Sequence, residues 1–161
     1  MAGAGIRFER TRNLRLVRGI YTLPRIWPWI GDDYAGDPET FEPNDDPRIV
    51  YLPVWERESL VGLFTFLPQS MICWEGHIIL LPRRETRGHV ILRGALEWMF
   101  QNTPARRITG AIPAYARLAL KLVQRAGMTQ YGTNPGSFMK HGKLEDQVLF
   151  GLSKEDLCPA S

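Results

Sequence analysis

Apolar and polar residues change their spacing several times along the first half of the chain. Apolar and charged residues alternate over 6–10, which is the period of a half-buried strand. Helical spacing begins at Leu14, with Thr11 or Asn13 as the candidate N-cap, and prolines predict a loop or short turn at 27–29. Three apolar runs then predict an antiparallel meander of strands at 48–55, 60–67 and 71–81.

Helix and strand patterns alternate in the second half. The predicted elements are helices at 90–100 and 115–126 and strands at 107–113, 130–132 and 147–152. The second helix is the clearest amphipathic segment, with Leu118 expected on its apolar side and Gly127 as its C-terminal stop. Polar residues from Ser153 predict a frayed tail. This order predicts an α/β (α+β) fold with a mixed, mostly antiparallel sheet flanked by helices.

The composition is that of one ordinary folded domain. The 161 residues are 44% hydrophobic and 23% charged, which excludes global disorder, and no apolar run approaches the roughly 20 residues that cross a bilayer. The first ten residues lack the apolar centre of a secretory signal. Cys73 and Cys158 fit neither a metal nor a disulfide framework. We expect one domain over 1–152, a polar tail over 153–161, free thiols, no membrane association and a cytoplasmic location.

Charge is distributed unevenly along the chain. Residues 1–80 hold 8 Lys/Arg and 11 Asp/Glu, whereas residues 81–161 hold 12 and 6. Most of the acidic excess lies in 31–47, which is either a solvated loop or a lip that attracts a cationic substrate such as an amine. The basic half suits a phosphorylated cofactor, an acidic partner or a solvated face. Nucleic acid is a weak candidate because no nucleic-acid motif accompanies the arginines.

Two stretches of the second half carry a family resemblance. Residues 75–88 read Glu-Gly-His-Ile-Ile-Leu-Leu-Pro-Arg-Arg-Glu-Thr-Arg-Gly, and residues 107–113 lead into a helix that closes with Ala126-Gly127-Met128. In this order they resemble the fourth strand, the Arg-Gly pyrophosphate loop, the fifth strand and the next helix of the GNAT superfamily of N-acetyltransferases. The resemblance covers residues 6–152. It implies a GNAT-like sheet whose central strands splay apart.

The resemblance also implies a chemistry, the transfer of an acyl group from acetyl-CoA to an amine. It places the cofactor between the fourth strand and the following helix, where backbone N–H groups and cations bind the pyrophosphate. The implied cofactor-binding residues are Leu80, Leu81, Arg83, Arg84, Arg87, Gly88, His89 and Val90. A basic, solvated helix start is the alternative interpretation of the same residues.

A general base must accept the proton of the attacking ammonium. Glu75 and His77 are the candidates, and because they lie two apart on a strand they face the same side. His77 is otherwise a hydrogen-bonded core histidine, and Glu75 a carboxylate at an exposed edge. No metal is expected.

Several positions depart from the family pattern. Val90 and Leu92 stand where the pyrophosphate loop usually has small residues, and Ala116 where the helix often begins with Asn. Val123 stands where a Tyr often protonates the leaving thiolate. The departures favour an alternative, a catalytically degenerate GNAT-fold structural or interaction protein.

A second, fainter resemblance bears on that alternative. The segments 110–113 and 146–150 are similar to strands of small GNAT-like proteins encoded by tailed bacteriophages, some of which are virion or assembly components. Trp27, Trp29 and Trp55 would then form a partner-binding patch, unless they pack in the core. A protein partner and a homodimer stay open at this point.

Overall fold

The computed structural model describes residues 5–82 and 84–157. The first half contains β1 (Ile6–Phe8), α1 (Leu14–Tyr21), α2 (Trp27–Ile30), β2 (Val50–Glu56), β3 (Ser59–Pro68) and β4 (Cys73–Leu80). The second half contains α3 (Gly88–Asn102), β5 (Arg107–Pro113), α4 (Arg117–Arg125), β6 (Thr129–Lys140), β7 (Lys143–Ser153) and α5 (Lys154–Leu157). None of the helices in these ranges is both long and apolar enough to cross a membrane.

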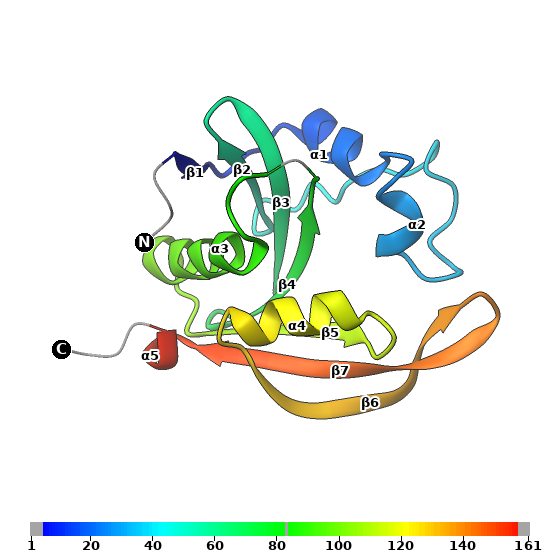
Figure 1. The fold of residues 1–161 in the computed structure, drawn as a ribbon. Coiled ribbons are helices and arrows are strands. Elements are labelled where there is room, and N and C mark those ends of the chain that lie inside the picture. The colour runs from blue at the N-terminus through cyan, green and yellow to red at the C-terminus, as the bar shows by residue number, and fades with distance from the viewer. Residues whose placement is uncertain (1–4, 83, 158–161) are drawn as a thin grey trace.

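One seven-stranded sheet organises the molecule, in the order β1-β2-β3-β4-β5-β7-β6 (Figure 1). All neighbouring strands are antiparallel except β4 and β5, which are parallel because α3 connects them as a crossover. The predicted mixed, mostly antiparallel sheet with flanking helices is confirmed.

The parallel pairing at the centre of the sheet is short. β4 pairs with β5 over only three residue pairs, from Cys73 with Arg107 to Glu75 with Thr109. Past this point β4 continues to Leu80 and β5 continues to Pro113, and the two strands no longer pair with each other. The central strands therefore splay apart, and one end of the sheet is open between them.

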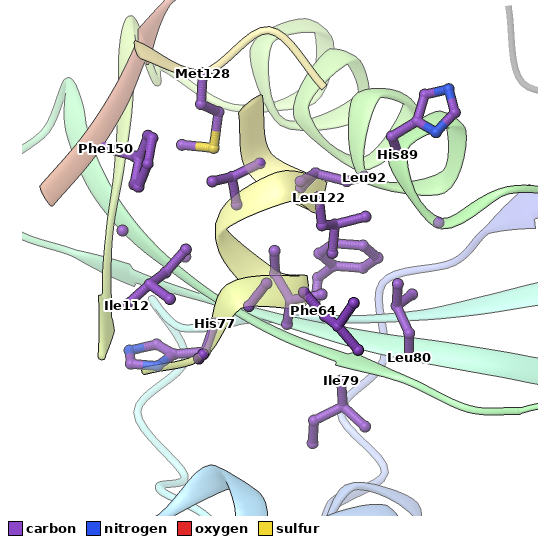
Figure 2. Close-up of a pocket in the computed structure, with 18 of the residues that line it drawn as sticks. Phe64, His77, Ile79, Leu80, His89, Leu92, Ile112, Leu122, Met128 and Phe150 are labelled. Atoms are coloured by element: carbon purple, nitrogen blue, oxygen red, sulfur yellow. The ribbon is translucent and has the colours of Figure 1, made fainter. Parts of the chain in front are cut away.

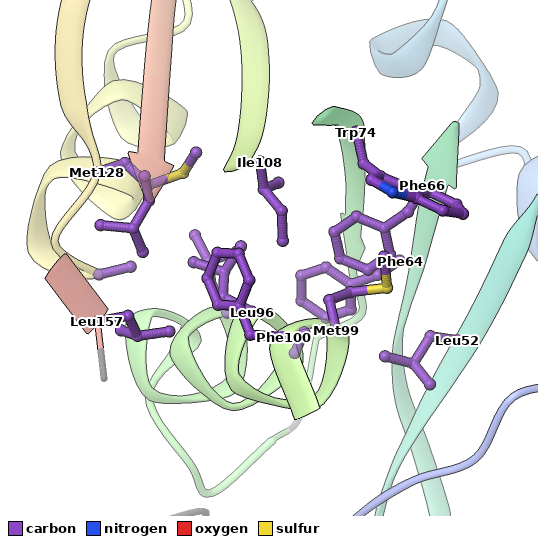
Figure 3. Close-up of a cluster of buried hydrophobic side chains, with 14 of the residues drawn as sticks. Leu52, Phe64, Phe66, Trp74, Leu96, Met99, Phe100, Ile108, Met128 and Leu157 are labelled. Carbon is purple, nitrogen blue, oxygen red and sulfur yellow. The ribbon is translucent and has the colours of Figure 1, made fainter. Parts of the chain in front are cut away.

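Two apolar clusters cover the two faces of the sheet. The larger one joins α3 and α4 to strand side chains such as Phe64, Phe66 and Ile108, all of them buried (Figure 3). The smaller one packs α1, through Val17 and Ile20, on the opposite face. The clusters follow from the two-residue period of strands, which sends neighbouring side chains of one strand to opposite faces.

The start of α1 follows the capping rule. Asn13 is its N-cap, and its side-chain oxygen accepts a hydrogen bond from the backbone N–H of Leu16. The predicted loop at 27–29 instead forms the short helix α2, with Pro28 in its first turn, where a missing N–H costs nothing. Residues between α2 and β2 form no helix or strand, as the acidic composition predicted.

The last two strands are much longer than predicted. They form one hairpin, whose turn at His141 and Gly142 has positive φ angles of 52° and 71°. A two-residue turn with positive φ at both residues matches the right-handed twist of the two strands that it connects, and Gly142 adopts this conformation without strain. β6 is a mostly exposed edge strand, so the apolar alternation that would have extended the prediction is missing.

Two further sequence expectations are wrong. Leu118 is 84% exposed, although helical spacing placed it on the apolar side of α4. The predicted frayed tail from Ser153 is ordered as far as Leu157, because α5 follows β7 directly and buries Leu157 in the larger cluster. Cys73 is a half-buried free thiol, and Cys158 lies outside the described residues. The division at residue 152 stays a prediction.

Truncating Leu157 tests whether this C-terminal turn belongs to the core. We expect Leu157→Ala to lower the free energy of unfolding by about 2 kcal/mol or more, because it leaves a cavity at a 5%-exposed site. Urea unfolding would measure the loss. The matched control is Leu144→Ala, at a 61%-exposed site, which should change stability by less than about 0.5 kcal/mol. Equal effects would show that α5 does not contribute to the core.

Candidate functional site

The opening between β4 and β5 leads into a cavity of about 1380 Å³. Its walls come from both strands, the start of α3, the length of α4 and the segment from the end of α1 to α2. Figure 2 shows its apolar side chains, among them Phe64 and Leu80 from the meander and Ile112 and Leu122 from the other side of the opening. The cavity thus joins the two faces of the sheet.

The strand edges along the opening present unpaired backbone groups. The Leu81 N–H donates to the Val61 carbonyl at 2.9 Å, so the backbone polar groups of Leu81 point toward β3. Because these groups alternate in direction along a strand, the N–H and carbonyl groups of Ile78 and Leu80 point toward β5. By the same alternation Ala111 of β5 directs its N–H and carbonyl toward β4, because the Ala114 N–H donates to Asp146 beside β7. An extended ligand with amide groups can add to these edges as a short strand would.

The start of α3 forms a cationic end of the cavity. Gly88 is the first helical residue and Arg87 the N-cap, and no side chain caps this terminus. The N-terminal N–H groups of a helix and its dipole attract anions. Arg84 and Arg87 line the cavity beside them.

Gly88 leaves little space for a side chain. A Cβ at this position would lie 2.9 Å from Leu80 Cδ1 and 3.0 Å from Leu122 Cδ1. These atoms are the ends of two side chains that line the cavity, so a larger residue at this position would have to displace them. As a glycine, this residue leaves the backbone at the start of α3 uncovered by a side chain of its own.

A buried carboxylate fixes the loop that leads into α3. Glu56, at the end of β2, accepts hydrogen bonds from the backbone N–H groups of Glu85 and Thr86, both at 2.7 Å, and from the Thr86 hydroxyl. The bond from the Thr86 hydroxyl and those from the two amides lower the pKa of Glu56. The Glu56 carboxylate thus holds in place the loop that carries Arg84 and Arg87.

Glu75 and His77 form a pair on the face of β4 that α1 covers. His77 Nε2 lies 2.9 Å from Glu75 Oε1, and Gln69 also donates to the Glu75 carboxylate. The hydrogen bond from His77 lowers the pKa of Glu75 against the opposing effect of partial burial. Glu75 is therefore a carboxylate at neutral pH, and it fixes the orientation of the imidazole.

A hydroxyl pair lies next to that imidazole. Thr65 is the cross-strand neighbour of His77, and its hydroxyl lies 2.7 Å from the hydroxyl of Tyr21. Burial raises the pKa of Tyr21, so the phenol is protonated at neutral pH. His77 and Tyr21 both line the cavity.

The acidic loop does not form the lip that one interpretation of the sequence offered. The Asp33 carboxylate accepts hydrogen bonds from the N–H groups of His141 and Gly142, both at 2.8 Å, and these bonds lower its pKa. Asp46 pairs with Arg48 at 2.6 Å. In the described part of the chain, no Asp or Glu lines the cavity.

The structure brings together most of the predicted site residues. His77, Leu80, Arg84, Arg87, Gly88 and His89 line the cavity. Glu75 reaches it only through His77, while Leu81 is buried in the smaller cluster and Val90 is not in the cavity wall. Arg83 lies outside the described residues. Their roles stay predictions.

Sequence reasoning missed several groups around the cavity. Tyr21, Arg25 and Glu56 were not predicted, because each is far along the chain from the other residues of the site. Glu56 in particular lies just after the strand predicted at 48–55, and no local pattern relates it to a loop 30 residues later. Among the described residues, no three His, Cys, Asp or Glu side chains are placed to hold a metal ion.

Comparison with known proteins identifies the fold. No protein-family model matches the sequence, and no curated protein matches it. A solved structure of spermidine N-acetyltransferase from Vibrio cholerae, in complex with CoA and spermine, is 14% identical with a TM-score of 0.78 and covers 96% of this chain and 99% of that one. A probable acetyltransferase is 13% identical with a TM-score of 0.70 and covers 96% of each chain.

These structural matches define the fold of the protein. The splayed sheet, the crossover helix after β4 and the cavity between β4 and β5 belong to the GNAT acetyltransferase fold, and this chain has that fold. At this level of identity the matches show the fold alone. A dodecameric form is described for the Vibrio cholerae enzyme, with a TM-score of 0.73 and 15% identity over 98% of each chain.

The hydrogen bonds of Glu56 should make the free energy of unfolding depend on pH. Its pKa is lowered in the folded state, so its stabilisation is complete above the unfolded-state pKa and is lost as the pH falls through the folded-state value. Glu56→Gln should therefore be less stable than the parent at pH 7, and the difference should shrink toward pH 3. Urea unfolding at several pH values measures it. Glu58→Gln, two residues along at an exposed site, is the control and should leave the profile unchanged.

Proposed function

We propose that this protein transfers an acetyl group from acetyl-CoA to an amine. The observation that carries the proposal is the cavity at the splay, which has a cationic helix start at one end and the His77–Glu75 pair on the opposite face of the sheet. A phosphorylated acyl carrier and an amine would meet between them. The fold of the similar solved acetyltransferases supports the same reaction class.

The residues present fit acetyl-CoA on structural grounds. Pyrophosphate needs cations and close backbone approach, which Arg84, Arg87 and Gly88 offer. The pantetheine amides need backbone partners, which the open edge of β4 offers at Ile78 and Leu80. When bound, acetyl-CoA supplies the activated acyl thioester.

His77 is our candidate for the general base. Its Nε2–H donates to the Glu75 carboxylate, which leaves the lone pair of Nδ1 to accept the ammonium proton of the acceptor. Glu75 is then a positioning residue that fixes the tautomer and stabilises the imidazolium that forms. Both act from the face of β4 that lies opposite α3.

Proton donation to the leaving thiolate needs a different residue from the one in the family pattern. Val123 is buried and apolar, so it has no proton to give. Tyr115 lines the cavity from the segment between β5 and α4, and burial together with the charges of Glu145 and Asp33 raises its pKa. A phenol kept protonated in this way makes Tyr115 our candidate donor.

Cofactor binding gives the first test of the proposal. Isothermal titration of CoA should show binding to the parent, and Arg87→Ala should weaken it about tenfold or more, since a cation on a phosphate is removed from the helix start. Arg15→Ala is the matched control, an exposed arginine of α1 outside the cavity wall, and it should bind as the parent does. No heat at millimolar CoA would contradict the proposal and favour a non-catalytic GNAT-fold module.

Turnover tests the His77–Glu75 pair separately from binding. We expect His77→Gln to lower kcat by about 10²-fold or more and Glu75→Gln by a smaller factor, with CoA affinity unchanged in both. Release of free CoA thiol in the presence of an amine measures the rate. Unchanged kcat in His77→Gln would remove this residue as the base.

A further inference from the structure

We infer that the acceptor is an amine on an apolar body that also carries an anionic group, and that it is not a polyamine. This inference rests on the proposed function and specifies its second substrate. It comes from the charge and polarity of the acceptor half of the cavity, which the segment from the end of α1 to α2 covers.

The acceptor half is mostly apolar and carries a cation. Tyr21, Ile26, Trp29 and Ile30 line it, and Trp29 is 79% exposed. Arg25, in the turn before α2, supplies the cation. Within residues 5–82 and 84–157 the Arg25 guanidinium has no ion-pair or hydrogen-bond partner, so its charge is available to a ligand.

The turn that carries Arg25 is held in place. The N–H groups of Ile26 and Trp27 both donate to the Leu23 carbonyl, at 2.8 and 2.9 Å. Ile26 and Ile30 pack against the smaller cluster on either side of Trp29. A fixed turn and helix thus place Arg25 and Trp29 in the wall of the same cavity, which suits a ligand with an anionic group and an apolar body.

Carboxylates that would attract several ammonium groups are absent from the described wall of the cavity. Glu75 lies behind His77 and can match one ammonium, the reacting one. Near Tyr115, the Asp33 carboxylate is bonded to two hairpin amides and Glu145 lies 3.4 Å from Lys143. Glu145 is thus paired with a lysine, Asp33 is engaged by hairpin amides, and neither lies in the cavity wall.

The charge balance therefore discriminates between acceptor classes. The second ammonium of a polyamine would meet Arg25 or the cations of α4, Arg117 and Lys121, instead of a carboxylate. Like charges held together in a cavity oppose binding, and an anionic group in the same place is attracted. Complementarity in sign thus selects an acceptor that carries one ammonium and one anion.

Three amines of graded charge test the inference. Phenylalanine, phenethylamine and spermidine serve as probes, because the first two differ only in the carboxylate and the third adds ammonium groups. With acetyl-CoA saturating, we expect kcat/KM to fall in that order, with at least a tenfold gap between phenylalanine and spermidine.

Arg25→Glu makes the test directional. Reversing the charge should lower kcat/KM for phenylalanine about three- to tenfold and raise that for spermidine, while phenethylamine changes little. Arg15→Glu, the same charge reversal outside the cavity wall, should leave the order of the three amines unchanged.

The outcomes separate this inference from the proposed function. CoA binding is measured without any amine, so its absence overturns the proposed function. CoA binding with spermidine as the preferred amine, or an unchanged preference in Arg25→Glu, overturns the inference alone. If no probe turns over, titration of phenylalanine into the CoA-loaded protein decides, and no binding overturns the inference.

Discussion

The early divergence of β4 and β5 is the constraint on which the site depends. Three residue pairs join the antiparallel meander β1–β4 to the antiparallel unit β5–β7, and the strands then separate. Two glycines lie where they part, Gly76 and Gly110, and a Cβ on Gly110 would meet the Gly76 carbonyl oxygen at 3.7 Å. Phe66 fills the space beside Gly76 and so closes the core just below the opening. The cavity exists because apolar packing stops there while both strands go on.

Several segments around the cavity are also held in place by polar contacts between residues far apart in sequence. Glu56 fixes the loop before α3, Asp33 holds the turn of the β6–β7 hairpin, and the Lys140 ammonium donates to the carbonyls of Pro28 and Gly31. The contacts from Asp33 and Lys140 join the α2 region to the hairpin on the other side of the splay. The two halves of the sheet are therefore connected at the α3 loop and again at the acceptor side.

The sequence predicted what depends on local periodicity and missed what depends on distant partners. Apolar spacing predicted the meander, α3 and α4, and the order of the elements predicted the mixed sheet that contains β5. The full hairpin did not emerge, since β6 is exposed and lacks alternation, and the burial of Leu157 depends on β7 delivering it to the core. At the site, backbone alternation decides that Leu80 faces the opening and Leu81 does not, and this register cannot be read from two neighbouring leucines.

The geometry also changes the weight of the departures from the family pattern. Val90 and Leu92 both stand where the family pattern has small residues. Val90 lies outside the cavity wall, and its N–H donates to the Arg87 carbonyl at 3.0 Å, whereas Leu92 lines the cavity. In the proposed function, close backbone approach matters at Gly88, which is a glycine. Val123 is different, because a buried valine in the wall removes a proton donor that no backbone group can replace. Under the proposed function, the departure that concerns proton transfer is therefore Val123, and Tyr115 in the cavity wall is the candidate that would replace the missing donor.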